Sequence, residues 1–218
     1  MTRSHRFLVP AVAFFLLGCA GGQAAVGQAP PTAQQAQSAR LLSDAVLLLP
    51  VHETTLEGSA DTAQLLSGPF DAEFRRLLEP HASSGWMWPD AVRQLHRRNP
   101  LNVPDPARLA TRDLRGSRLA AGEIVSAELG SQIRALLAVA GARRYVLLPL
   151  RLHAGAASNG GHAGGLTLVT IDARRSTILL VQRVATRIDD AAAQAGAAAV
   201  AHAIAAAAQR EMTGPIEQ

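Results

Sequence analysis

Apolar residues recur in two different periods along the chain, and together these periods predict one domain of mixed secondary structure. Continuous apolar runs are typical of buried strands, and they occur at 45–51, 145–152, 166–171 and 177–185. Apolar residues three and four positions apart predict helices, at 70–78, 89–99, 125–140 and 190–210. A short strand at 85–88, a short helix at 107–114 and a mobile connection at 154–165 complete the pattern. We therefore predict an α+β fold, with a mixed β-sheet packed against several α-helices.

The amino terminus has the pattern of an export signal. Arg3 and Arg6 precede an apolar run at 7–17, which is too short to anchor a helix across a bilayer. The run ends in Leu16-Leu17-Gly18-Cys19, which resembles the bacterial lipobox. That resemblance implies that residues 1–18 are removed and that Cys19 is diacylated as the new amino terminus. An ordinary signal peptide with a chance cysteine, or a buried free thiol, is the alternative.

The lipobox defines the expected domain organisation and location. Residues 19–39 are rich in Gly, Ala, Gln and Pro, which predicts a lipidated flexible tether before a periplasmic domain at 40–212 and a tail at 213–218. Ala20 stands where an Asp would retain a lipoprotein at the inner membrane under the enterobacterial sorting pattern. We therefore expect a protein attached to the outer membrane through its lipid and facing the periplasm.

Composition narrows the possible partners. The 218 residues include 43 Ala, 21 Arg, no Lys and one Cys, which excludes an intramolecular disulfide framework. Removal of Arg3 and Arg6 with the signal leaves 19 Arg against 17 acidic residues, a formal charge of +2. The high isoelectric point therefore gives little reason to expect a nucleic-acid partner.

Three segments carry a family resemblance. They are Ala45-Val-Leu-Leu-Leu-Pro-Val51, Ala140-Gly-Ala-Arg-Arg-Tyr-Val-Leu-Leu148, and the hairpin formed by Leu166-Thr-Leu-Val-Thr-Ile-Asp172 and Ser176-Thr-Ile-Leu-Leu-Val181. The pattern resembles the periplasmic domain of the curli-secretion lipoprotein, of the lipoprotein activators of penicillin-binding proteins, and of the amino-terminal part of TolB. This resemblance implies an α+β fold and a mostly non-enzymatic role, and it assigns no catalytic residue.

One alternative function uses histidines. His52, His153 and His162 could converge as a three-imidazole metal site in an envelope enzyme, although no helix or tight spacing fixes them. Ordinary surface or loop histidines are the simpler interpretation. The chain has no phosphate-binding glycine loop, no nucleophile elbow and no His-Glu-x-x-His motif, so we expect neither a catalytic residue nor a cofactor.

A possible partner surface lies in the middle of the chain. Trp86 and Trp88 alternate, so both side chains should share one face, either as an aromatic platform or as core residues. Arg93, Arg97 and Arg98 begin an arginine-rich stretch that could meet anionic lipid or an acidic partner, or could simply be solvated. Our leading hypothesis is a non-enzymatic, lipid-anchored module that binds an envelope protein or assembles with itself.

Overall fold

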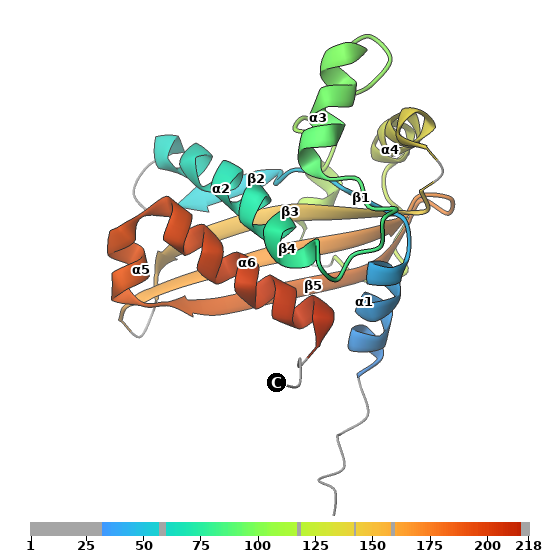
Figure 1. Cartoon of the computed structure of the whole chain (residues 1–218). Coiled ribbons are helices and arrows are strands. Elements are labelled where there is room, and N and C mark those ends of the chain that lie inside the picture. Colours follow the sequence, from blue (N-terminus) through green and yellow to red (C-terminus); the bar gives the residue numbers. More distant parts are fainter. Residues whose placement is uncertain (1–31, 57–59, 117–118, 142, 158–159, 215–218) are drawn as a thin grey trace, which may run out of the picture. The chain divides into compact units, whose positions relative to one another are not determined.

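The computed structural model describes residues 32–56, 60–116, 119–141, 143–157 and 160–214, with the side chains of 60–64 left out. The predicted signal peptide, Cys19 and the tail beyond Gly214 lie outside these residues. The described part has the predicted α+β fold, in which a mixed sheet packs between helices (Figure 1). No helix within it is long and apolar enough to cross a lipid bilayer.

The sheet is built around three long strands. They are β3 (Tyr145–Ala156), β4 (His162–Asp172) and β5 (Thr177–Ile188), which pair antiparallel in sequence order. Two short strands, β1 (Val46–Leu48) and β2 (Glu53–Leu56), lie one after the other along the free edge of β3 and run parallel to it. Pro50 lies between them, where a missing backbone N–H interrupts the pairing. The result is a sheet with β5 at the opposite edge.

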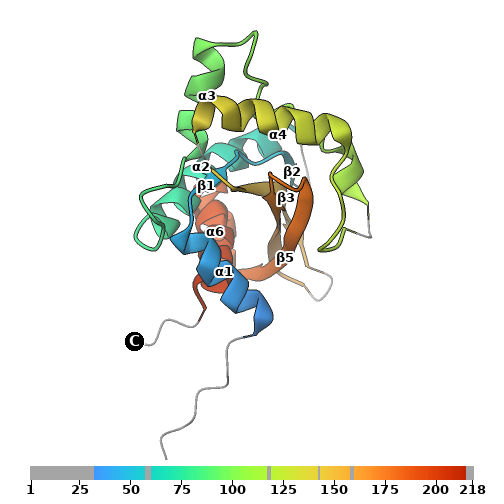
Figure 2. The same cartoon turned by 90° about the vertical axis from the view of Figure 1, so that its right-hand side faces the viewer.

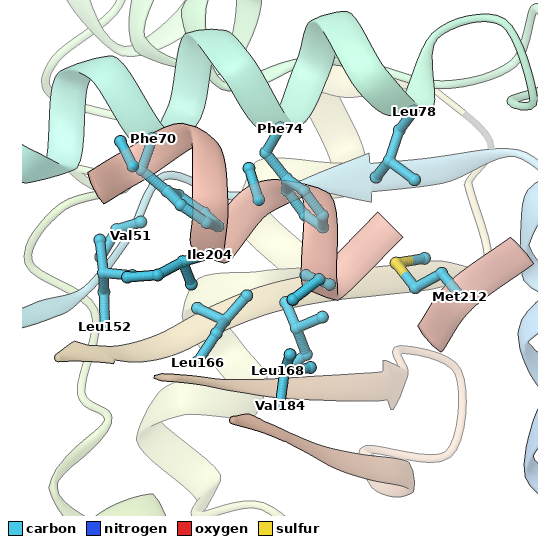
Figure 3. Close-up of a cluster of buried hydrophobic side chains, with 14 of the residues drawn as sticks. Val51, Phe70, Phe74, Leu78, Leu152, Leu166, Leu168, Val184, Ile204 and Met212 are labelled. Carbon is cyan, nitrogen blue, oxygen red and sulfur yellow. The ribbon is translucent and has the colours of Figure 1, made fainter. Parts of the chain in front are cut away.

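Two long helices cover one face of the sheet. Figure 1 shows α2 (Ala60–Leu78) and α6 (Ala197–Thr213) side by side across the strands. Phe70 and Phe74 of α2 stack with ring centroids 5.2 Å apart. These rings meet Ile204 of α6 and the strand residues Leu152, Leu166, Leu168 and Val184, as the close-up in Figure 3 shows.

The alanine-rich helix lies close to the sheet, as its composition predicts. Ala201, Ala205 and Ala208 are fully buried on its inner side. Gly164 of β4 faces the same helix, and a methyl group there would lie 2.7 Å from Cδ1 of Ile204. Small side chains on both elements therefore allow the close approach. Gly196 (φ +93°) separates α6 from the short helix α5 (Asp190–Ala195), whose N-cap is Asp189.

The other face of the sheet is covered only over half its length. There α4 (Ala127–Ala140), α3 (Pro89–Arg98) and the 3₁₀ turn η1 (Arg112–Arg115) form a second core with the first part of β3 and the facing ends of β4 and β5. Figure 2 shows α4 lying across this end of the sheet. The core residues here include Val146, Leu148 and Leu150 of β3, and from Arg151 onward no described helix covers this face of the strand.

Several predicted boundaries are wrong. Residues 33–39 are not tether, because they belong to α1 (Ala33–Ser43), which begins at a capping box formed by Thr32 and Gln35. The supposed mobile connection at 154–165 contains the paired ends of β3 and β4. The helix predicted from Phe70 begins at Ala60, the segment 85–88 makes only a single bridge through Met87, and the helix expected at 107–114 is the later turn η1.

Candidate functional site

The three histidines of the metal-site alternative do not come together. His153 lies on the open face of β3, where its ring covers Gly165 of the neighbouring strand. His162 lines a hollow on the opposite face, between β4 and the helices α5 and α6. Among the described residues, no group of three or more His, Cys, Asp or Glu side chains is arranged to hold a metal ion. The convergent three-imidazole site is therefore wrong, because the sheet separates two of its members.

His52 has a structural position of its own. Its Nε2 lies 3.1 Å from the carbonyl oxygen of Leu109, and burial lowers the pKa of the imidazole. The neutral ring therefore donates Nε2–H to Leu109, which leaves Nδ1 buried with no partner among the described residues. His52 fastens the loop around Leu109 to the edge of the sheet.

The two tryptophans share a face, as their alternation predicts, and that face belongs to the core. The centroids of their rings lie 5.3 Å apart. Trp86 is only 6% exposed and belongs to the core that the sheet forms with α2 and α6. Trp88 is partly buried at the margin of the same core, with Arg75 over its ring. The aromatic-platform reading is therefore wrong for Trp86, because its side chain does not reach the surface.

The arginines of α3 differ in their surroundings. Arg93 contacts the buried carboxylate of Asp71 and also bonds Asp90, so its charge is used within the domain. Arg97 and Arg98 are exposed at the end of the same helix, and no bond to another described side chain ties them down. Of these three arginines, only Arg97 and Arg98 fit the predicted charged surface.

A second group of charged residues lies on the open half of the sheet. The strand registers place Glu53 of β2, Arg151 of β3, Thr167 of β4 and Arg183 of β5 in one row across four strands. The Nε atom of Arg151 lies 3.6 Å from Oε2 of Glu53. Arg183 donates from Nη2 to the carbonyl oxygen of Leu119 at 3.3 Å. Two arginines thus flank a threonine on a bare sheet surface.

Arg115 brings a third guanidinium to this row from the turn η1. Its Nε contacts Oε1 of Glu53, so one carboxylate orients two arginines. Arg115, Arg151 and Arg183 line a hollow of about 420 Å³ with Thr167. The remaining lining residues are mostly apolar and belong to the adjoining core: Leu114, Leu119 and Leu150. We call this feature the arginine hollow.

The charge balance of the arginine hollow favours anions. Among the described residues of this site, three guanidinium groups stand against one carboxylate, that of Glu53, and arginine stays protonated at any physiological pH. Their exposure is intermediate to high, with 55% of the Arg115 side chain and 43% of the Arg151 side chain accessible. A ligand could therefore reach them while the floor of the hollow stays apolar.

The sequence contained a signal for the arginine hollow that the apolar runs obscure. Along 150–154, apolar and polar residues alternate, which is typical of a strand with one solvated face, and Arg183 and Arg187 interrupt the apolar run of the later strand. Interpreting these strands as wholly buried missed Arg151 and Arg183. The pairing of Glu53 with Arg115 had no local signal, because the two residues meet only through the fold.

Comparisons with known proteins give a distant likeness. No family model and no curated protein sequence matches the chain. Among solved structures, the lipoprotein GNA1162 from Neisseria meningitidis is 10% identical with a TM-score of 0.36, over 69% of this chain and 83% of that one. The PelC dodecamer from Paraburkholderia phytofirmans gives 12% identity and a TM-score of 0.37, over 81% and 91% respectively. Similarity at this level identifies neither a family nor a ligand.

Proposed function

We propose that this chain is a lipid-anchored protein of the bacterial cell envelope whose α+β domain binds a partner without catalysing a reaction. Anchoring is inferred from the sequence Leu16-Leu17-Gly18-Cys19 after a short apolar run. The anchor places the protein at the outer membrane facing the periplasm, as Ala20 suggests. The tether then confines the domain near the membrane surface.

The observation that carries the binding role is the open half of the sheet. Helices pack on one face of the sheet and on part of the other, whereas no described helix covers the row from Glu53 to Arg183, which is rich in arginine. Arginine is enriched at binding surfaces because its planar group makes several directed bonds at once. We assign the contact surface to the arginine hollow.

Lipid attachment is tested by the substitution Cys19→Ser in the full-length chain. The expected result is loss of labelling by a palmitate analogue and release of the protein into the soluble periplasmic fraction. Cys19 is the one cysteine of the sequence, and only a thiol can carry the thioether-linked lipid. Gln28→Ser, a change in the same segment outside the lipobox, should keep both properties. Continued membrane association of Cys19→Ser would contradict the anchor.

The binding role is tested by crosslinking in intact cells. Replacing Arg151 and Arg183 by Glu reverses the charge of the arginine hollow and should abolish crosslinks that the wild-type protein forms with its envelope partner. Arg174 and Arg210 are also exposed, and they lie outside the hollow. The matched change of these two to Glu should leave the crosslinks intact. Equal crosslinking by both double variants would contradict the assigned surface.

A further inference from the structure

We propose that the arginine hollow is a binding site for a phosphate monoester in its dianionic form. This inference deepens the proposed binding function, since it names the chemistry of what the open sheet surface recognises. The assignment rests on the hydrogen-bond donors, the charge and the size of the arginine hollow.

The arginines are oriented but keep donors for a ligand. Glu53 is contacted through the Nε atoms of Arg115 and Arg151, which leaves the terminal Nη groups of both side chains without a partner among the described residues. Among the described residues, Arg183 bonds only Leu119, through Nη2. Each guanidinium carries five N–H donors in a fixed fork, and this fork matches the oxygen spacing of phosphate. Glu53 therefore acts as a positioning residue.

The charge of the arginine hollow matches that of a dianion. Three arginines and one glutamate give a net +2 at neutral pH. A phosphate monoester carries about −1.5 to −2 at pH 7, because its second pKa is near 6. A carboxylate or a phosphodiester would neutralise only one of the two charges. The hydroxyl of Thr167, between Arg151 and Arg183 in the row, adds one neutral donor.

The size of the hollow indicates a ligand larger than the bare ion. A volume of about 420 Å³ lies within the usual range of small-molecule sites, which runs from about 300 to 1,000 Å³. The apolar floor of Leu114, Leu119 and Leu150 can contact the part that bears the phosphate. Both a soluble phosphate ester and a phosphorylated lipid headgroup have this chemistry.

The test is calorimetric titration of the mature chain carrying Cys19→Ser, with inorganic phosphate and glycerol 3-phosphate as probes at low salt and pH 7.5. We expect saturable binding at one site per chain. Arg151→Gln and Arg183→Gln should each weaken it about tenfold or more, since each removes charge-assisted hydrogen bonds. Arg183→Lys keeps the charge but loses the fork, and it should also weaken binding. Arg174→Gln is the matched control and should bind like the wild type.

The pH dependence tests the charge of the ligand. Affinity should fall as the pH drops from 7.5 to 5, because the probe gains a proton while the arginines stay charged. Absence of binding up to about 10 mM of either probe would overturn the inference, because a site with a dissociation constant of about 1 mM would be nearly saturated at that concentration. Equal binding by the wild type, Arg151→Gln and Arg183→Gln would also overturn it.

Vesicle sedimentation separates the two sources of the phosphate. Binding to vesicles with phosphatidic acid, a monoester, in preference to phosphatidylglycerol, a diester, supports the lipid headgroup. Binding to soluble esters without vesicle binding supports a small ligand. Equal binding to both vesicle types with no binding of soluble esters indicates general charge attraction and overturns the site.

The phosphate titration and the crosslinking experiment can fail separately. Phosphate binding that is lost in the arginine variants, with unchanged envelope crosslinking, would keep this inference and contradict the proposed partner surface. Loss of crosslinking in the variants without any phosphate binding would keep the partner surface and contradict this inference.

Discussion

Asp71 and Arg93 form an ion pair that joins the helices on the two faces of the sheet. Asp71 lies on α2, in the layer above one face, and Arg93 lies on α3, which packs on the other. Asp71 is 7% exposed, and its second oxygen accepts a hydrogen bond from the backbone N–H of Val51, at 3.2 Å. The pair therefore links both helices to the chain segment between β1 and β2, at the edge of the sheet.

Replacement of this carboxylate should alter the pH dependence of stability. Burial raises the pKa of Asp71 from 3.8 to about 6, and this effect exceeds the opposing influence of Arg93. The folded state then holds a proton that the unfolded state releases between these values, so the carboxyl group lowers stability as the pH rises from about 4 to about 6. The full difference corresponds to about 3 kcal/mol.

Chemical denaturation of the wild type and Asp71→Asn between pH 4 and 7 measures this contribution. Asparagine keeps an acceptor for the N–H of Val51 but cannot ionise, so the stability of the variant should lack this pH-dependent contribution. Relative to the variant, the wild type should gain stability as the pH is lowered from 6 to 4. Parallel curves would show that Asp71 does not titrate in this window, and the opposite slope would show that Arg93 dominates its environment.

Close packing between β4 and α6 should make Gly164→Ala destabilising. The added methyl group would lie 2.7 Å from Cδ1 and 2.8 Å from Cγ1 of Ile204, which is closer than atoms can pack. Overpacking of this kind costs about 1–3 kcal/mol. The free energy of unfolding, measured by urea titration, should fall by that amount.

A double-mutant cycle with Ile204→Val identifies the cause. Valine lacks Cδ1 but keeps Cγ1, so the single change costs about 0.5–1.5 kcal/mol through lost packing and relieves only the closer of the two contacts. The double variant should therefore be more stable than the sum of the single effects predicts. Additive effects would mean that the methyl group at Gly164 does not meet Cδ1 of Ile204.

The elements with a strong local signal are those that the sequence predicts best. The helix at 125–140 has a continuous apolar face and a glycine stop, and it matches α4 closely. The hairpin around Asp172 is found because its turn is stabilised locally, with the Asp172 carboxylate accepting from the N–H of Arg174 at 2.9 Å. Local chemistry determines both features, so single-sequence reasoning is sufficient for them.

The features that were missed depend on distant partners. The alanines and glutamines of 33–39 suit a linker as well as a helix, and α1 is held by elements far along the chain, since it packs on α6 and bonds Gln182 of β5. The glycines at 155–165 indicate a loop, although Gly165 lies beneath the ring of His153 and Gly164 beneath Ile204. The arginine hollow likewise exists only after four strands align. These three features depend on contacts between residues far apart in the chain, so the local sequence pattern does not predict them.

Docking of α1 can be tested through Ser38. Its Oγ accepts a hydrogen bond from Nε2 of Gln182 in β5 at 3.1 Å, and both side chains are buried. Ser38→Ala leaves that amide without a partner and should cost about 1–3 kcal/mol in urea unfolding. The control Gln34→Ala changes an exposed residue of the same helix and should have little effect. If Ser38→Ala changes the free energy of unfolding as little as Gln34→Ala does, then residues 33–39 are a tether.

Two glycine substitutions should change stability in opposite directions. Gly141 ends α4 with φ +88° and ψ 177°, a region that only glycine occupies readily, so Gly141→Ala should cost about 1–3 kcal/mol. Gly116 has φ −66° and ψ 154°, and a methyl group there would meet nothing within 4 Å. Gly116→Ala should therefore stabilise the domain by about 0.4–1 kcal/mol, because it restricts only the unfolded chain. Thermal unfolding of both variants checks the signs. A neutral result at Gly141 would show that the residue after α4 does not keep the positive φ angle described.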